Sequence, residues 1–393
     1  MPNLNKSKII YSLIAFVFLI TIIIIGAIKL PTQTKKSNLA TPPQDKLFVA
    51  THDNKGTIYL NIFDVKTNTT TQKIVKIKDV INEFSKSNAA YANDAVQYNE
   101  KTNTVYISTS GVGSYDGRCL NTDGTCESRI YRLGMKDTTP VKIYSKKCAI
   151  RNWVITPNDA ILVGCEENNL QTISLIDAIS IQTIFTKEFA IPSEVNLTQF
   201  VRSNDGQFVY QFAKQYQSEN SPRHIISLRK FSLATGELAA RELVKSDLSL
   251  ETSDTLSPDE NLLAYYSGPV FTREPLHILD ISTGKTSTHE TTGNIDNINL
   301  VWSGDSEHVI QIFKDGVKSF NTKTKQLTTL IDGQQDNYIH TWGPSDHYIT
   351  YTPYGPTMSE TSTLQILDIK NQQTIDSHIE VNNQFFVVGA RWF

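Results

Sequence analysis

One pattern recurs along most of this chain and limits what it can fold into. It consists of an apolar segment, a turn rich in Ser, Pro, Asp, Asn or Gly, and a second segment in which apolar and polar residues alternate. Asp, Asn, Gly and Pro suit such turns because they tolerate or pre-set the required backbone angles. The clearest copies lie at residues 153–163, 200–210, 255–265, 300–310 and 340–350, with a degenerate copy at 95–107. The pattern predicts pairs of strands joined by tight turns.

A second motif follows each copy at a variable distance. It is a strand, a tight turn and another short strand, most clearly at residues 225–236, 276–285 and 364–373. Together the two motifs give four strands per unit, and units recur roughly every 40 to 57 residues, as in the blades of a propeller. The alternatives are a β-sandwich or two smaller all-β domains, but the repeat continues without a break in composition. We therefore expect an all-β chain folded as a β-propeller.

The two ends of the repeat region are incomplete in complementary ways. Residues 47–68 contain the later strands of a unit without its opening strand, whereas residues 385–393 look like an opening strand with nothing after it. We expect the C-terminal strand to pair with the N-terminal sheet, because this would cover an exposed sheet edge. Six internal units and one shared unit give seven blades, with six or eight as alternatives.

An uncharged apolar run occupies residues 9–28. About 20 apolar residues suffice to cross the hydrocarbon core of a bilayer as a helix. A cleaved signal peptide is the alternative, but its apolar region is shorter, and residues 26–31 make a poor cleavage site. We expect a short cytoplasmic segment at residues 1–8 and a transmembrane signal-anchor helix at 9–30. A flexible linker at 31–46 and the propeller domain at 47–393 would follow.

Lysines flank both ends of the apolar run, so the distribution of positive charge leaves the orientation of the run in the membrane open. The four cysteines therefore serve to predict the compartment of the propeller. An even number of cysteines in an exported chain favours two disulfides. Cys119 and Cys126 bracket a loop that turns readily, and Cys148 and Cys165 lie on either side of the turn at residues 156–159. A four-cysteine zinc site is the alternative, although the spacing lacks a repeated C-x-x-C. We expect disulfides, with the propeller outside the cytoplasm at the cell membrane.

The paired motifs, Trp-Ser/Thr-Pro-Asp followed by Leu-x-Ile-x-Asp-x-x-Thr-Gly, resemble the TolB-like and WD-type propeller repeats. TolB-like repeats also occur in the propeller domains of prolyl-oligopeptidase-type enzymes. The resemblance covers residues 150–373 best, and it departs from the pattern where Asn204 and Gly304 replace the proline. These residues shape turns and pack blades, so the resemblance implies an architecture and no chemistry. It also implies an interaction role outside the cytoplasm, as TolB has with envelope partners.

Few residues suggest chemistry. A loop containing Asp116, Asn121, Asp123 and Glu127 could hold calcium through oxygen ligands, although its spacing fits no EF-hand. Residues 111–117 miss the spacing of a phosphate-binding loop. The eight histidines are scattered, and no Ser, His and Asp are singled out as a catalytic set. We expect no catalytic residue and no cofactor.

The charge balance narrows the function. The chain has 37 basic and 40 acidic residues and a net charge of -3, which argues against a nucleic-acid binder. We expect a non-enzymatic module or scaffold of the cell envelope that binds a protein, peptide or glycan on its propeller face. The alternative is a propeller hydrolase or lyase with its site at the channel mouth. A sensor ranks last, because the segment before the apolar run is too short for an output domain.

Overall fold

The computed structural model describes most of the chain beyond residue 45. The described residues are 46–53, 57–76, 95–109, 127–167, 169–198, 200–203, 205–215, 224–246, 250–267, 275–290, 295–313, 315–333, 337–342, 347–353, 362–381 and 385–392. They belong to one compact unit, Pro43–Phe393. All of their regular secondary structure is β-strand.

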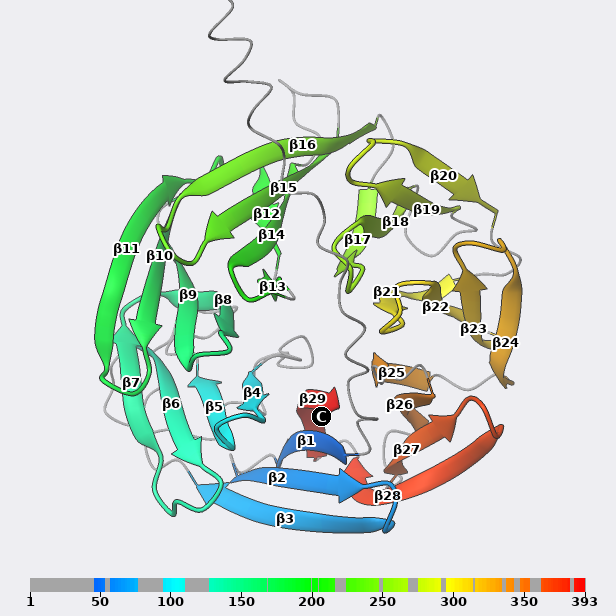
Figure 1. The fold of residues 1–393 in the computed structure, drawn as a ribbon, viewed down its shortest axis with the longest axis horizontal. Helices are drawn as coiled ribbons and strands as arrows, with labels where there is room; N and C mark the ends of the chain where they lie inside the picture. Colours follow the sequence, from blue (N-terminus) through cyan, green and yellow to red (C-terminus); the bar gives the residue numbers. More distant parts are fainter. Residues whose placement is uncertain are drawn as a thin grey trace, which may run out of the picture. The chain divides into compact units, whose positions relative to one another are not determined.

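Seven antiparallel sheets form a closed β-propeller (Figure 1). We number the blades from the sheet that contains the first strand. The first three blades are as follows: blade 1, β29 (Phe385–Trp392), β1 (Lys46–Asp53), β2 (Thr57–Asp64) and β3 (Thr69–Lys76); blade 2, β4 (Val96–Asn99), β5 (Thr104–Thr109), β6 (Ser128–Gly134) and β7 (Val141–Lys146); blade 3, β8 (Ala149–Ile155), β9 (Ala160–Glu167), β10 (Leu170–Asp177) and β11 (Gln182–Ala190).

The other four blades repeat this plan, with the innermost strand written first. They are blade 4, β12 (Val195–Leu197) with β13 (Val201–Arg202), β14 (Phe208–Gln215), β15 (His224–Ser232) and β16 (Leu238–Ser246); blade 5, β17 (Leu250–Leu256), β18 (Leu262–Ser267), β19 (Leu276–Asp280) and β20 (Thr286–His289); blade 6, β21 (Ile295–Trp302), β22 (His308–Phe313), β23 (Gly316–Asn321) and β24 (Leu327–Asp332); blade 7, β25 (Asn337–Trp342), β26 (Tyr348–Pro353), β27 (Ser362–Asp368) and β28 (Gln373–Val381).

The two ends of the described chain share blade 1. Strand β1 pairs with β2 on one side and with β29 on the other, in a register that runs from Leu47↔Trp392 to Asp53↔Phe385. A bulge lies between Ala50 and Thr51. The expected shared blade and the count of seven are therefore confirmed, and the sandwich and two-domain alternatives are wrong.

The recurring turn motif has one geometry in blades 4, 5 and 6. In each, a serine hydroxyl donates to the carboxylate two residues later, over 2.7 Å at Ser203, 2.6 Å at Ser257 and 2.5 Å at Ser303. The same hydroxyl accepts the backbone N–H five residues later, at 2.9 Å in all three turns. The motif therefore closes the hairpin between the first and second strands, as expected of side chains that replace backbone hydrogen bonds in turns.

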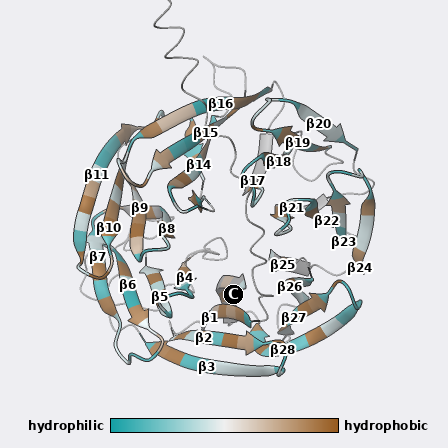
Figure 2. Cartoon of the chain, in the orientation of Figure 1, coloured by the Kyte–Doolittle hydropathy of each residue, from teal (hydrophilic) through white to brown (hydrophobic). Residues whose placement is uncertain are grey.

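The core lies between the blades, because alternate residues of a strand face opposite neighbours. On β1, Leu47 and Val49 pack with blade 7, whereas Phe48 and Ala50 pack with blade 2. The Phe48 and Tyr98 rings stack with their centroids 4.8 Å apart. Apolar and polar residues accordingly both recur along the strands all around the ring (Figure 2). Every blade is stabilised mainly by its two neighbours.

One of the two expected disulfides lies within the described residues. Cys148 precedes β8, and Cys165 lies on β9, so the β8–β9 hairpin places their Cα atoms 5.8 Å apart in a disulfide. The expected Cys148–Cys165 bridge is confirmed. Cys119 and Cys126 fall outside the described residues.

The predicted membrane anchor at residues 9–30 also falls outside the part of the chain that the structure describes. Within that part, no helix is long and apolar enough to cross a bilayer.

The antiparallel blades give the propeller two unlike faces. We call the side with the connections between first and second strands, and between third and fourth strands, the turn face. The opposite side, with the connections between second and third strands and between blades, is the loop face. Lys46 pairs with Asp64, which directly precedes the β2–β3 turn. The chain therefore joins the propeller on the turn face.

Candidate functional site

A groove of about 430 Å³ lies on the turn face between blades 5 and 6. Its walls are the turns of both blades, and most of its lining side chains are polar. Four carboxylates and three ammonium groups line it: Asp259, Asp280, Asp305, Glu307, Lys285, Lys323 and Lys325. We call this set the blade 5–6 groove.

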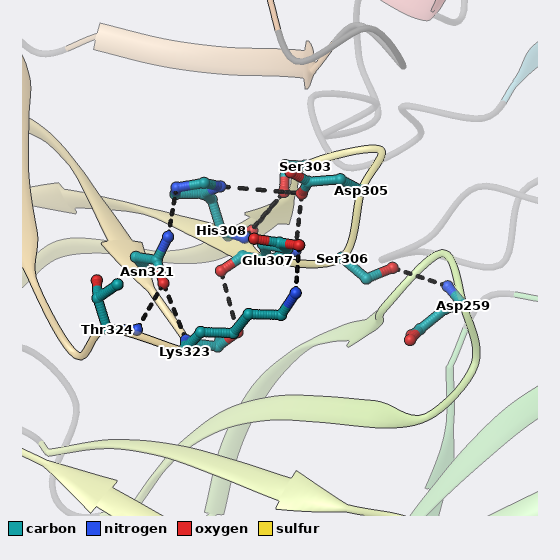
Figure 3. Close-up of polar contacts among 10 residues, drawn as sticks. Asp259, Ser303, Asp305, Ser306, Glu307, His308, Asn321, Lys323 and Thr324 are labelled. Carbon is teal, nitrogen blue, oxygen red and sulfur yellow. Dashed lines mark hydrogen bonds and ion pairs between the residues drawn. The ribbon is translucent and has the colours of Figure 1, made fainter. Parts of the chain in front are cut away.

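The two walls are joined by the repeated turns themselves (Figure 3). The backbone N–H of Asp259, in blade 5, donates to Ser306 Oγ, in blade 6, over 2.9 Å. Ser306 has a backbone φ of 64°, and Glu260 a φ of 66°. Few residues other than glycine adopt this left-handed conformation outside tight turns. The turns therefore fix the positions of the groove's charged side chains.

Hydrogen bonds lower the pKa of two of the groove's aspartates, Asp259 and Asp280. Burial alone would raise the pKa of Asp259, but hydrogen bonds from Ser257, Asn261 and Ser306 outweigh it and lower that pKa below its usual value. The Ser282 hydroxyl and the Thr283 N–H donate to Asp280 Oδ1, over 2.7 and 2.9 Å, and lower the pKa of Asp280. Both carboxylates are therefore negatively charged at neutral pH.

The lysines differ in how they are held. Lys323 forms an ion pair with Glu307, and this hydrogen bond raises the pKa of Lys323 (Figure 3). Lys325 Nζ donates to the carbonyl of Thr322. Lys285 bonds to its turn through its backbone, since its N–H donates to Thr283 Oγ1 and its carbonyl accepts from the N–H of Asp280.

Ser303, Asp305 and His308 lie together in this wall, yet they are not arranged as a catalytic triad. Ser303 donates to Asp305 and not to the imidazole, and His308 Nδ1 is 3.8 Å from Asp305. The Asn321 Oδ1 atom accepts backbone N–H groups at 2.8 and 2.9 Å, so its Nδ2 must donate to His308 Nε2 over 2.8 Å. The Nε2 atom of His308 is therefore occupied by Asn321. These three residues shape the turn.

The expected calcium loop is only partly within the described residues, since Asp116, Asn121 and Asp123 fall outside them. Glu127 accepts a hydrogen bond from Ser145 Oγ over 2.6 Å and lies 3.8 Å from the guanidinium of Arg129. Among the side chains that the structure describes, no three from His, Cys, Asp and Glu are grouped as metal ligands.

The innermost strands surround the channel axis in Figure 1. Their described side chains include no carboxylate. Several instead connect neighbouring blades: Gln97 of β4 donates to the Trp153 carbonyl over 3.0 Å, and Arg202 of β13 donates to the Ile155 carbonyl over 3.2 Å. His340 of β25 contacts Thr352 Oγ1 at 2.7 Å, and burial lowers the pKa of His340 to about 3, although part of the residue reaches the surface. Among the described side chains, carboxylates gather in the blade 5–6 groove, whereas the side chains of Glu251, Asp254 and Asp296, on the innermost strands β17 and β21, fall outside those described.

The sequence contained one signal for this groove that our prediction did not use. In adjacent copies of the turn motif, acidic and basic residues follow the motif's serine, as in residues 303–308. Neighbouring blades bring such turns together in the structure. The turns were predicted, but their pairing across two blades was not.

No family model matches this chain, and no curated protein matches it. Solved structures do resemble it. A putative 6-phosphogluconolactonase from Bacteroides fragilis has a TM-score of 0.53 at 12% identity, covering 90% of this chain and 99% of that one. A puromycin-hydrolyzing peptidase of Mycobacterium tuberculosis has a TM-score of 0.53 at 11% identity, covering 86% of this chain and 54% of that one.

A putative TolB from Agrobacterium tumefaciens is also similar, with 13% identity, a TM-score of 0.41, and coverage of 65% of this chain and 94% of that one. The chain spans about half the length of the prolyl endopeptidase and the puromycin hydrolase that it resembles, 49% and 48% of them respectively. Identities this low establish the fold alone.

These comparisons correct the main functional expectation. We expected a non-enzymatic binding or scaffold module, but the similar propellers include prolyl endopeptidases and puromycin hydrolases. They favour the alternative, a propeller hydrolase. The expectation was wrong because the repeat motif specifies turns and blade packing, which enzymes and scaffolds share. An envelope protein, peptide or glycan partner stays a prediction.

Proposed function

We propose that this chain is a propeller hydrolase that opens a small, hydroxylated and negatively charged lactone in the blade 5–6 groove. The observation that carries the proposal is the groove's set of ionised aspartates beside lysines. A similar propeller that matches over 99% of its own length, a putative 6-phosphogluconolactonase, supports the same substrate class.

The groove's groups suit the parts of such a substrate. Ammonium groups of Lys285 and Lys325 would bind its anionic group, since charge-assisted hydrogen bonds are the strong ones. Ser287, Ser306 and Thr322 would bind its hydroxyls. The Asp280 carboxylate accepts hydrogen bonds of its turn at Oδ1, and we assign Oδ2 as the atom that takes a proton from water.

The reaction needs no further reactant. Water adds to the lactone carbonyl and gives one proton to the Asp280 carboxylate. The ring C–O bond then breaks, and that proton passes to the departing ring oxygen, which becomes a hydroxyl. The carboxylic acid that remains ionises and releases a proton to solvent, so the product is a hydroxy carboxylate. A nearby ammonium group would stabilise the oxyanion that forms on the carbonyl oxygen.

Proton release from a panel of sugar-acid lactones tests the proposal. Asp280→Asn keeps the oxygen that accepts the turn's hydrogen bonds, and we expect it to lower kcat about 100-fold or more, the usual effect of losing a general base. Lys285→Ala should raise KM about tenfold, because a hydrogen bond to a charged group is lost. The controls are Asp368→Asn and Lys370→Ala, in the corresponding turn of blade 7. If no lactone is opened, or if both groove variants behave like their controls, the proposal is wrong.

We also propose that residues 9–30 anchor the chain in a membrane, with the propeller outside the cytoplasm. The Cys148–Cys165 disulfide supports this, since disulfides persist mainly in oxidising compartments. Protease added to intact cells should then digest the propeller, whereas a propeller protected until the cells are lysed would contradict the orientation.

A further inference from the structure

Strongly exposed large hydrophobic side chains are confined to one part of the ring. Within the described residues, all of them belong to blades 1 to 3, with exposed fractions from 42% to 66%. They are Ile74 on β3, Val141 on β7, Leu170 on β10, Ile179 and Ile181 in the β10–β11 turn, and Ile184 on β11. Blades 4 to 7 expose none among their described residues.

The outermost strands of the same blades are basic. Strands β3, β7 and β11 carry five lysines and a single acidic residue: Lys73, Lys76, Lys142, Lys146, Lys187 and Glu188. The outermost strands of blades 4 to 7 instead mix Arg241 and Lys245 with Glu242, Asp332, Asp376 and Glu380. Edge lysines also discourage strands from pairing between molecules. Lys73 is used within the protein, because its Nζ donates to the carbonyls of Gly134, Met135 and Asp137 in blade 2. For the other four lysines, the need to protect an edge is the same in every blade, so it does not explain why they gather on three.

Ile181 adds a conformational observation. Its φ is 59°, a left-handed value that is strained for a β-branched residue. The corresponding turns of other blades place Asn68, Gly236, Gly284, Lys325 or Gln372 in this conformation. Blade 3 therefore keeps an exposed isoleucine where the backbone favours glycine or asparagine, so folding alone does not account for it.

The chain joins the propeller beside this surface. Lys46 begins β1 on the turn face of blade 1, and Val141, Ile179 and Ile181 lie at the turn-face ends of blades 2 and 3. Only 15 residues, 31–45, separate the proposed anchor from β1, and a chain of that length reaches about 50 Å at most. A bilayer that held residues 9–28 would thus be within reach of these side chains.

We propose that the outer wall of blades 1 to 3, formed by β3, β7, β11 and the β10–β11 turn, rests on the anionic surface of a lipid bilayer. Isoleucines would enter the headgroup boundary, and lysines would bind the anionic headgroups, as on interfacial amphipathic surfaces. Blades 5 and 6 lie across the ring from this wall in Figure 1, so the blade 5–6 groove stays open to water. This inference rests on the proposed membrane anchor and does not depend on the hydrolase proposal.

Lysine labelling of the full chain in vesicles tests the contact. The chain is reconstituted into phosphatidylcholine vesicles with or without phosphatidylglycerol and treated with an amine-reactive reagent. We expect Lys76, Lys142 and Lys187 to react several-fold more slowly in the anionic vesicles. The reference lysines, Lys285 and Lys370, should react equally in both. Raising the salt to 1 M should abolish the difference, because the Debye length falls to about 3 Å.

Two variants separate the apolar and the ionic contributions to binding of the wall to the vesicle surface. Ile179→Ser/Ile181→Asn/Ile184→Ser alters exposed side chains only, and it should let Lys142 react as fast as in neutral vesicles. Lys142→Ala should weaken the protection of the other wall lysines from the amine-reactive reagent about fivefold. This is the expected contribution of one basic residue to binding at an anionic surface.

Other outcomes would overturn the assignment. If the wall lysines react equally in both vesicle types, the wall does not contact the anionic lipid surface. If the wall and reference lysines are protected equally, the chain is only tethered to the vesicle and no particular face rests on it. Protection in native membranes but not in vesicles would identify a protein as the occupant. Lactone hydrolysis is measured separately, so its failure would leave these results intact.

Discussion

Asp159 shows how single residues hold neighbouring blades together. It lies in the β8–β9 turn of blade 3, is buried, and has a φ of 55°. Its Oδ1 atom accepts hydrogen bonds from three side chains of blade 2: Asn99 Nδ2 at 2.7 Å, Thr102 Oγ1 at 3.0 Å and the Tyr106 hydroxyl at 2.8 Å. Burial and the Asp159 carboxylate raise the pKa of Tyr106, which stays a donor at any physiological pH.

Removing the Tyr106 hydroxyl should destabilise the protein. Tyr106→Phe takes one of three donors from a buried carboxylate, and hydrogen bonds to charged groups are worth about 1.5–3 kcal/mol. We expect a loss of that size in the free energy of unfolding, measured with denaturant. Tyr144→Phe is the control, because burial alone raises the pKa of Tyr144, to about 12. Equal losses in the two variants would show that the bond to Asp159 contributes little.

At this scale the sequence was informative about turns and uninformative about networks. The serine and aspartate of residues 257–259 predicted a tight turn, because both groups that close it lie within a few residues. The partners of Asp159 lie in another blade, and no local pattern pairs them. The acidic and basic side chains of the blade 5–6 groove were not predicted to lie together for the same reason, because they come from turns of two different blades.

Among the structural elements, the β22–β23 hairpin depends on one glycine. Gly316 has a φ of 137°, and a Cβ atom placed there would lie 2.1 Å from the carbonyl oxygen of Ile331 on β24. Gly333, just after β24, has a φ of 117° but no atom within 4 Å of such a Cβ. Both glycines have a strongly positive φ, and they differ in what surrounds them.

Alanine substitutions at these positions should separate backbone strain from crowding. Gly333→Ala should cost about 1–3 kcal/mol of stability, the range for a residue held in a sparsely populated conformation. Gly316→Ala should cost clearly more, because β23 and β24 must also move apart. Thermal unfolding of both variants provides the comparison, and similar losses would mean that β24 relaxes freely.

Strand boundaries show where the sequence pattern was sufficient. Apolar alternation identified the paired strands of blades 3 to 7, since each face of a strand packs on a neighbouring blade. It did not reveal that blade 4 divides its innermost position between β12 and β13, because strands of two or three residues carry too little pattern.

For the whole molecule, the β29–β1 pairing decides whether the ring is closed. Incomplete first and last units predicted this pairing, because a propeller with an open sheet edge would be exposed to other chains. Trp392 is buried there, and its ring stacks on Tyr348 of blade 7 with centroids 5.2 Å apart. Strand β29 thus also packs against blade 7.

Deleting residues 385–393 should therefore lower the melting temperature sharply and promote aggregation. Burial of one tryptophan alone contributes about 3–5 kcal/mol, and the exposed edge of β1 would become available to other chains. Deleting Phe393 alone, which lies after β29, is the control. A melting temperature that is the same for both truncations would refute closure by β29.

Closure by the last strand has a consequence during synthesis. The ribosome releases β1, β2 and β3 first, yet their sheet is finished only when β29 emerges, after every other blade has been made. Until then the growing chain carries an unfilled place at one end of a stack of blades, where a chaperone or a second nascent chain could bind. The time at greatest risk of misassembly is therefore set by translation of the whole chain, and not by the folding of any single blade.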